Sequence, residues 1–295
     1  MASIAFIGIG AMGLPMAQNL IAVGHSVTGY DTRSLQMSRL ASTGARAVDA
    51  AAFAVRDADF VITCLPDIQS LRAVYVDSSE VLKAAKRSAI LIDCSTVGID
   101  EIRLLVSTVE ASGLTMLDAP VIGDPADVKA RMLTFVVGGS LAAFAEAKPV
   151  LSDMGERVIH VGKTGMGQAA ALCTNLMTIV NLIGAAEAFA LSERLGLAAE
   201  KLFEVAAMST ASSWSLIDRC PQSGLVPEAP SNNLYQGGFA AERALKQLKL
   251  LETSGGKVDA RTPLTSQAVD LFAEYCDVRD PRLDFSAIIQ ILRRR

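Results

Sequence analysis

Short apolar runs alternate with helical patterns through the first half of the chain. Residues 4–9 and 26–31 predict strands, and residues 12–24 between them space their apolar positions as a helix does. A further helical pattern ends at Leu40, and later apolar runs occupy residues 60–66, 89–95 and 115–121. Strands that alternate with helices form a parallel sheet covered on both faces, so this half predicts a doubly wound α/β fold.

Two more runs, residues 132–139 and 157–163, extend the predicted sheet to about residue 162. Strand signals end at Gly165, and a loop rich in Pro, Gly, Ser and Asn spans residues 220–239. Helical spacing governs the rest, at residues 167–195, 197–209, 240–255 and 263–276. The sequence thus predicts a Rossmann domain over residues 1–162 and an all-helical substrate and oligomerisation domain over residues 163–295.

Composition narrows the function classes. The chain has 295 residues, 51% of them apolar, which is enough material for two cores. A net charge of -4 disfavours a broad phosphate-neutralising surface, so we expect no nucleic-acid partner. Five cysteines without C-x-x-C spacing predict reduced thiols and a cytoplasmic protein. With only two histidines, a histidine metal site or a Ser-His-Asp triad is disfavoured, and we expect no metal.

Residues 172–191 carry a single charge, Glu187, and so have the composition of a membrane span. Four of them are polar: Thr174, Asn175, Thr178 and Asn181. Such groups are costly in lipid, so a helix buried in protein is favoured. The opening residues carry no basic leader or cleavage site and lead directly into a predicted strand. We therefore expect no membrane attachment.

A G-x-G-x-x-G pattern, Gly8 to Gly13, separates the first predicted strand from the first helix. Gly8 permits a tight turn, Gly10 lets the backbone approach a pyrophosphate, and Gly13 lets helix and strand pack closely. Backbone N–H groups at the helix start, around Ala11 and Met12, then face the anion. We expect this turn to bind a dinucleotide.

The second predicted strand ends at Asp31, about twenty residues after the glycine pattern. A carboxylate there accepts hydrogen bonds from the adenosine ribose, which favours NAD. Arg33 suits a 2'-phosphate, however, so NADP stays open. We expect Asp31, Thr32 and Arg33 to line the adenosine end of the site.

Residues 8–20, GIGAMGLPMAQNL, resemble the opening signature of the β-hydroxyacid dehydrogenases, relatives of 3-hydroxyisobutyrate dehydrogenase and tartronate semialdehyde reductase. The resemblance spans nearly the whole chain, through VITCLP at 61–66, IDCST at 92–96, LDAPV at 117–121, LTFVVGG at 133–139, YQGGF at 235–239 and the closing DFSAIIQILR. It implies an NAD(P)-dependent oxidoreductase that passes hydride between a nicotinamide and a small hydroxy acid or semialdehyde. It also implies a homodimer or homotetramer.

The resemblance also implies roles for individual residues. The family's cofactor-contacting positions after the fourth and fifth strands correspond to Leu65, Pro66, Ser95 and Thr96, and Ser95 is also a candidate for substrate contact. Lys246 matches a lysine near the nicotinamide, and Phe239 is a further candidate for cofactor contact. The Asp that follows this lysine in the family is replaced by Gln247. Trp214 and Phe239 also match positions in the family's substrate pocket.

One departure concerns the chemistry itself. The family carries G-x-G-x-x-x-K-x-x-x-N on the helix between domains, where the Lys is the general acid/base and the Asn holds substrate. Residues 165–175 match this pattern except that Ala171 stands at the lysine position. A methyl group carries no proton, and general acid/base catalysis is worth about 10² to 10⁴ in rate. Asn175 remains one helical turn away on the same face.

A second departure lies after the sixth strand, where the family continues with Ser-Gly-Gly and binds the substrate carboxylate. Here the residues are Ile122, Gly123 and Asp124, so a hydroxyl is lost and an acid is gained. Gly123 is still expected to orient substrate, but Asp124 should repel a carboxylate, although Lys129 or Arg131 nearby would compensate. Both departures indicate a changed substrate.

Three functions remain open. The leading one is a 3-hydroxyacid dehydrogenase, inactivated by an exchange of Lys for Ala that is either engineered or natural. The second is an imine reductase, because such enzymes resemble this family, lack its lysine and reduce an iminium that already carries its proton. The third is a dinucleotide-binding protein without catalysis.

Overall fold

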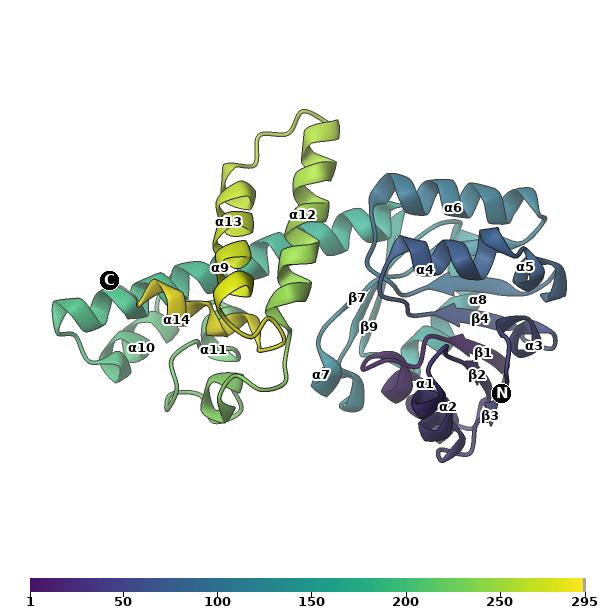
Figure 1. The fold of residues 1–295 in the computed structure, drawn as a ribbon, viewed down its shortest axis with the longest axis horizontal. Coiled ribbons are helices and arrows are strands. Elements are labelled where there is room, and N and C mark those ends of the chain that lie inside the picture. The colour runs from purple at the N-terminus through teal and green to yellow at the C-terminus, as the bar shows by residue number, and fades with distance from the viewer. Residues whose placement is uncertain (294–295) are drawn as a thin grey trace. The chain divides into compact units, whose positions relative to one another are not determined.

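The computed structural model describes residues 1–293, and the chain forms two compact units, Met1–Ala171 and Leu172–Arg295 (Figure 1). The units divide inside helix α9, whereas the predicted boundary at residues 162 and 163 lies between β9 and α9. The last two residues of the predicted helical domain lie outside the described residues.

The first unit holds a sheet and the helices around it. Its strands are β1 (Ser3–Ile7), β2 (Ser26–Tyr30), β3 (Arg46–Ala47), β4 (Phe60–Thr63), β5 (Ile90–Asp93), β6 (Thr115–Asp118), β7 (Val121–Ile122), β8 (Thr134–Gly138) and β9 (Arg157–Gly162). Its helices are α1 (Gly13–Ala22), α2 (Ser34–Ala41), α3 (Ala51–Val55), α4 (Ile68–Arg72), the π-helical turn η1 (Ala73–Asp77), α5 (Glu80–Ala84), α6 (Ile99–Ala111), α7 (Pro125–Lys129) and α8 (Leu141–Ser152).

Within the described residues these strands form one nine-stranded sheet in the order β3-β2-β1-β4-β5-β6-β8-β7, with β9 beside β8. The strands from β3 to β6 are all parallel. The chain moves outward in one direction through β1, β2 and β3, and then returns to the other side of β1 with β4. This reversal is the switch point at which doubly wound sheets bind ligands, beyond the carboxyl ends of the strands.

The expectation of a purely parallel sheet is wrong at one edge. Strand β8 runs antiparallel to β6 and β7, and only its pairing with β9 is parallel. A parallel connection needs a crossover of a dozen or more residues, usually through a helix. The only helix between β7 and β8 is α7, which spans five residues, so the chain folds straight back.

Helices cover both faces of the sheet, as Figure 1 shows, because successive strand residues point to opposite sides. Ile4 and Phe6 of β1 join a core with α1 and α8. Ala5 and Ile7 of the same strand join the core on the other face, with α4, η1, α5 and α6. Both cores are fully buried at β1, so the sheet is a rigid platform for its carboxyl edge.

Helix α9 (Met166–Leu195) starts in the first unit and continues into the second. Among the described residues it is the one helix long and apolar enough to cross a membrane, and 33% of its most apolar stretch is buried. A core helix of a soluble protein has the same length and composition, so this is weak evidence for a membrane span.

The second unit is helical. Beyond α9 its elements are α10 (Ala199–Ala207), α11 (Trp214–Ile217), the 3-10 turn η2 (Pro230–Asn233), α12 (Ala241–Lys257), α13 (Pro263–Val278), the 3-10 turn η3 (Phe285–Ile288) and α14 (Ile289–Leu292). Its own core joins α9, α12, α13 and the closing turns around Phe189, Phe272 and Phe285. The ordered loop expected at residues 220–239 is present and contains η2.

Candidate active site

The glycine turn is built as the sequence predicts. Gly8 has a positive φ of 96°, and a Cβ there would lie 2.4 Å from the carbonyl oxygen of Cys64. A Cβ on Gly13 would lie 2.0 Å from the carbonyl oxygen of Gly8. Of the described residues, none caps the start of α1 with its side chain, and the first turn holds no acid. The turn therefore fits a dinucleotide pyrophosphate, which would meet the backbone around Gly10, Ala11 and Met12.

Asp31 follows β2 directly and lies against this turn. Its Oδ2 accepts a hydrogen bond from the backbone N–H of Ile9 at 2.8 Å, inside the glycine pattern. Burial acts to raise the pKa of Asp31, but hydrogen bonds from Arg33 and Ile9 outweigh it and hold the pKa below its usual value. The carboxylate is thus ionised at neutral pH beside the turn, with Thr32 and Arg33 following it in the chain.

The loops after β4 and β5 are joined through one hydroxyl group. The N–H of Leu65 donates to Ser95 Oγ at 2.9 Å, and Ser95 Oγ donates to Asp93 Oδ1 at 2.6 Å. Thr63 Oγ1 donates to the same carboxylate oxygen at 2.8 Å. Burial raises the pKa of Asp93 to about 6, although the hydrogen bonds from Ser95 and Thr63 oppose the rise.

Ser95, the candidate for cofactor and substrate contact, is almost fully buried. Its hydroxyl proton is committed to Asp93, and it accepts from Leu65. The side chain therefore acts mainly as a tie between the two loops that carry Leu65, Pro66 and Thr96. These residues lie at the carboxyl edge of β4 and β5, next to the switch point.

The first turn of α9 is fixed to the sheet by Asp118, at the end of β6. Asp118 Oδ1 accepts from the N–H of Gly165 at 2.8 Å, and Oδ2 accepts from the N–H of Gln168 at 3.0 Å. A Cβ on Gly167 would lie 2.6 Å from the carbonyl oxygen of Val136. Burial raises the pKa of Asp118, while the N–H groups of Gly165 and Gln168 act to lower it. The glycines before Ala171 thus allow the helix to begin directly against the strands.

Gln168 extends this anchor to the loop after β5. Its Nε2 donates to the carbonyl oxygen of Ser95 at 2.7 Å, and its Oε1 accepts from the N–H of Val97 at 3.1 Å. Residues three apart share a helix face, so Ala171 lies on the face that Gln168 turns toward this loop. Ala171 is fully buried. Position 171 is therefore buried on the same side of α9 as the anchor formed by Gln168.

The loop after β6 is arranged around Asp124, which is nearly buried. Its Oδ1 accepts from the N–H groups of Ala126 at 2.7 Å and Asp127 at 3.1 Å, and so caps α7. The N–H of Asp124 in turn donates to Asp127 Oδ2 at 2.8 Å. Gly123 has a positive φ of 137°. The acid gained at position 124 is thus a helix cap, and its N–H already has an acceptor.

Four of the predicted site residues belong to the second unit. Asn175 lies on α9, one helical turn beyond Ala171, and is half-buried. Trp214 begins α11 with its side chain 47% exposed, and the guanidinium of Arg219 lies over the ring, 5.1 Å from its centre. Phe239 packs edge-on against Phe285 with ring centres 5.3 Å apart.

The loop that carries Phe239 is held by Asp284. Asp284 Oδ2 accepts from the N–H of Phe239 at 2.8 Å, and Oδ1 accepts from the hydroxyl and the N–H of Ser286. A Cβ on Gly238 would lie 2.1 Å from Asp284 Oδ2. Burial raises the pKa of Asp284 to about 6, against the lowering effect of the hydrogen bonds from Ser286 and Phe239.

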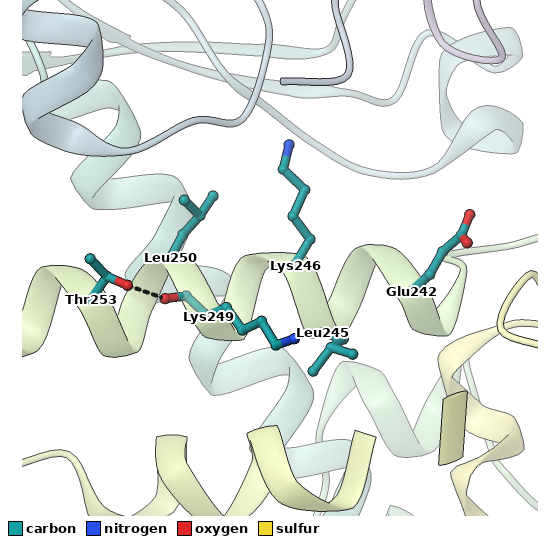
Figure 2. A pocket seen from close by; sticks show the side chains of 6 residues that line it. All are labelled: Glu242, Leu245, Lys246, Lys249, Leu250 and Thr253. Atoms are coloured by element: carbon teal, nitrogen blue, oxygen red, sulfur yellow. Dashed lines mark hydrogen bonds between the residues drawn. The ribbon is translucent and has the colours of Figure 1, made fainter. Parts of the chain in front are cut away.

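Lys246 lies on the exposed side of α12. There it lines a hollow of about 370 Å³ together with Glu242, Leu245, Lys249, Leu250 and Thr253. Figure 2 shows that all six come from one face of the helix and that the Lys246 side chain extends away from the helix axis. Two amines one turn apart give this face a local positive charge.

Sequence reasoning assigned no role to four buried residues that hold the site in place: Asp93, Asp118, Gln168 and Asp284. A signal was present, since each acid interrupts or ends an apolar run. Its meaning depends on partners far away in the chain. Within residues 1–293 the structure shows no group of three or more His, Cys, Asp or Glu placed to hold a metal.

The doubly wound sheet and its glycine turn define a dinucleotide-binding protein. Residues 3–162 match the family model of the NAD binding domain of 6-phosphogluconate dehydrogenase. Residues 165–292 match the model described as NAD-binding of NADP-dependent 3-hydroxyisobutyrate dehydrogenase.

Individual relatives agree with these matches. A probable 3-hydroxyisobutyrate dehydrogenase of Mycobacterium tuberculosis is 40% identical, over 100% of this chain and 99% of that protein. An NAD-dependent L-serine dehydrogenase of Pseudomonas aeruginosa is 36% identical, over 98% and 97%. The solved structure of the M. tuberculosis 3-hydroxyisobutyrate dehydrogenase with L-serine has a TM-score of 0.94 at 39% identity, covering 100% of both chains.

The chain therefore belongs to the β-hydroxyacid dehydrogenase family and is an NAD(P)-dependent oxidoreductase. Its cofactor is NAD, with NADP as a second possibility. The solved structure of an imine reductase from Myxococcus stipitatus matches over 99% of both chains, with a TM-score of 0.67 at 18% identity. This likeness shows a shared fold and nothing further.

Proposed function

We propose that this protein passes hydride between NAD and a small 3-hydroxy acid or its semialdehyde, at the carboxyl edge of β1, β4 and β5. The observation that carries the proposal is the anchoring of α9. Gln168 bonds the loop after β5 at Ser95 and Val97, which holds position 171 beside the loops that surround the glycine turn. The relatives named above support the substrate class, since their names include 3-hydroxyisobutyrate and L-serine dehydrogenases.

In this proposal the nicotinamide supplies or accepts the hydride, and the chain's own residues bind and orient. Asp31 holds the adenosine end, and the start of α1 holds the pyrophosphate. By their positions in the family pattern, Asn175, Gly123 and Trp214 are assigned to the substrate, and Phe239 and Lys246 to the cofactor. Ala171 has no proton to give or take, so the reaction lacks a factor of about 10² to 10⁴ that a general acid/base supplies.

The test is oxidation of NADH and NADPH against a panel of small semialdehydes, with the chain as it stands and with Ala171→Lys. We expect the dinucleotide to bind and the reaction to be barely detectable in the parent. Ala171→Lys should raise the rate by about 10² or more. Ala170→Lys is the matched control, because it adds the same charge one residue away on another face of α9. No gain with either lysine would contradict the proposal.

A specific observation favours the imine reductase as a second candidate. Position 171 offers a buried methyl group, Ile122 offers no hydroxyl, and the N–H of Asp124 already donates to Asp127. An iminium carries its own proton and needs no carboxylate site. Adding cyclic imines to the same panel separates the two functions. Imine reduction by the parent that is unchanged or lost in Ala171→Lys would identify an imine reductase.

We also propose a soluble, cytoplasmic homodimer or homotetramer. Large apolar side chains are exposed along α9, on α10 and directly after it: Met177, Leu191, Leu195, Val205 and Met208. Large apolar side chains that are exposed close together usually mark a surface that contacts another protein chain. Light scattering of the purified chain tests the assembly, and a monomer at micromolar concentration would contradict it.

A further inference from the structure

A positive charge lies against the side chain of Trp214. The guanidinium of Arg219 is placed over the indole ring, 5.1 Å from the ring centre. Trp214 begins α11, and Arg219 follows two residues after this helix ends and is half-buried. A cation over an aromatic ring is attracted by the negative face of the ring, and this attraction uses no hydrogen-bond acceptor. The contact therefore holds a cation beside a residue assigned to the substrate.

The same charge acts on Asp284, the buried acid that holds the loop of Phe239. Burial raises the pKa of Asp284, and the charge of Arg219 is close enough to be among the influences that lower it. Asp284 Oδ2 accepts from the N–H of Phe239 at 2.8 Å. Trp214 and Phe239 both match positions in the family's substrate pocket. One cation is thus associated with both aromatic residues, with the first directly and with the second through Asp284.

The carboxylate of a 3-hydroxy acid needs a partner that the loop after β6 supplies poorly. The side chain of Asp124 is a nearly buried acid, and its N–H already donates to Asp127 Oδ2 at 2.8 Å. Ile122 has no hydroxyl to offer. A guanidinium is always charged, and its planar donors match the two oxygens of a carboxylate. Arg219 therefore has the chemistry that this loop lacks.

We propose that Arg219 is a specificity-determining residue that binds the carboxylate of the substrate beside Trp214. The inference rests on the proposed function, because it takes the substrate to be a small 3-hydroxy acid or its semialdehyde. The indole supports the face of the guanidinium, and the N–H groups at its edge bind the carboxylate oxygens. The same charge repels an iminium. Arg219 thus selects an acid over a neutral or cationic ligand.

A purely structural role for Arg219 predicts a different result. If its charge served only to stabilise Asp284 and the loop of Phe239, its loss would weaken the binding of acidic and neutral ligands alike. Direct contact with a carboxylate affects the acidic ligand alone. The comparison of two ligands that differ in charge but not in size therefore separates the two roles.

Isothermal titration calorimetry of the full chain, in the presence of NAD, compares 3-hydroxypropionate with 3-hydroxypropionamide, its uncharged analogue. Arg219→Gln should raise the Kd for the acid about ten-fold and change that for the amide by less than about two-fold. Arg219→Lys keeps the charge without the planar donors, so it should raise the Kd for the acid about three-fold. Arg261→Gln removes an equal charge from an exposed position between α12 and α13 and should change neither value.

Three results would overturn the inference. The first is an equal Kd for the acid in the parent and in Arg219→Gln. The second is an equal loss for acid and amide in Arg219→Gln, which would assign Arg219 to the support of Asp284. The third is a parent chain that does not bind the acid at all.

Failure of the inference and failure of the proposed function are distinguishable. If the acid binds through Arg219 but Ala171→Lys brings no gain in hydride transfer, the proposed function fails and the inference stands. If Ala171→Lys gains activity while Arg219→Gln binds the acid as the parent does, the inference alone fails.

Discussion

Gln168 donates a hydrogen bond from its Nε2 to the carbonyl oxygen of Ser95, at 2.7 Å. The two residues are 73 positions apart in the chain. One starts the helix that carries position 171, and the other follows β5 at the switch point of the sheet. The side-chain amide of Gln168 thus fixes the start of the helix that carries position 171 to the loop after β5.

Replacement of Gln168 should destabilise the first unit. Gln168→Ala leaves the buried carbonyl of Ser95 and the N–H of Val97 without their partner, at about 1–3 kcal/mol for each group. We expect the free energy of unfolding to fall by about 2–6 kcal/mol, measured by urea denaturation followed by circular dichroism. Gln267→Ala, at an exposed position of α13, should change it by less than about 0.5 kcal/mol. Equal losses would refute the anchoring role.

Two glycines of the same helix should respond in opposite ways. Gly167→Ala places a Cβ 2.6 Å from the carbonyl of Val136, so it should be strongly destabilising or prevent folding. Around Gly184 the described residues leave a Cβ free of contacts within 4 Å, and Gly184→Ala should stabilise α9 by up to about 1 kcal/mol. Thermal unfolding of the two variants measures both effects. A neutral Gly167→Ala would contradict the close approach of α9 to the sheet.

The stability of the second unit should depend on pH through Asp284. Burial raises its pKa to about 6 in the folded state, against about 3.9 when unfolded. Since the folded pKa is the higher, this contribution is complete below about pH 4 and is lost as the pH rises through 6. The loss is about 3 kcal/mol for two pKa units.

Urea unfolding at pH 4 and pH 7, followed by the fluorescence of the sole tryptophan, Trp214, measures this dependence. Asp284→Asn should flatten it. Asp270→Asn, at an exposed position of α13, should leave it as in the parent chain. An identical pH dependence in all three proteins would show that Asp284 does not titrate in this range.

Removal of the Ser95 hydroxyl should change the ionisation of Asp93. Its hydrogen bond favours the charged carboxylate, so Ser95→Ala should raise the pKa of Asp93 further above 6. Infrared titration of the carboxyl band measures this shift. Ser95→Ala also removes the acceptor of the Leu65 N–H, so the loop after β4 should be less well fixed. Because this loop is proposed to contact the cofactor, we expect a weaker affinity for NADH. Ser107→Ala on the surface of α6 is the control and should change neither value.

Much of the fold could be predicted because its signals are local. The glycine turn, the alternation of strands and helices, the long α9 and the acid at the end of β2 are each visible within a short window of sequence. Strand β8 was predicted at residues 132–139, but its antiparallel direction was not, because that direction depends on the short connection through α7. Asp124 appeared to be a free acid, since the cap it forms depends on the N–H groups of Ala126 and Asp127.

The residues that hold the candidate site in place could not be predicted, because their hydrogen-bond partners lie far away in the sequence. Asp118 contacts Gly165 and Gln168 across about fifty positions of sequence, and Asp284 contacts Phe239 across 45. A lone acid in an apolar run shows that some partner exists without showing which one. The sequence offers candidates for ligand contact, whereas the residues that hold these candidates in place were found only in the structure.

Asp118, Gln168 and the glycines at 165 and 167 hold the start of α9 against the sheet. The residue at position 171 contributes none of these bonds. An ancestor could therefore exchange its reactive side chain there without unfolding, and a descendant could acquire a new one in a single step. The residues that fix the helix are thus different from the residue at position 171. A change of side chain at this position can therefore alter the chemistry while the fold is kept, which makes it a suitable place for new reactions to evolve or to be designed.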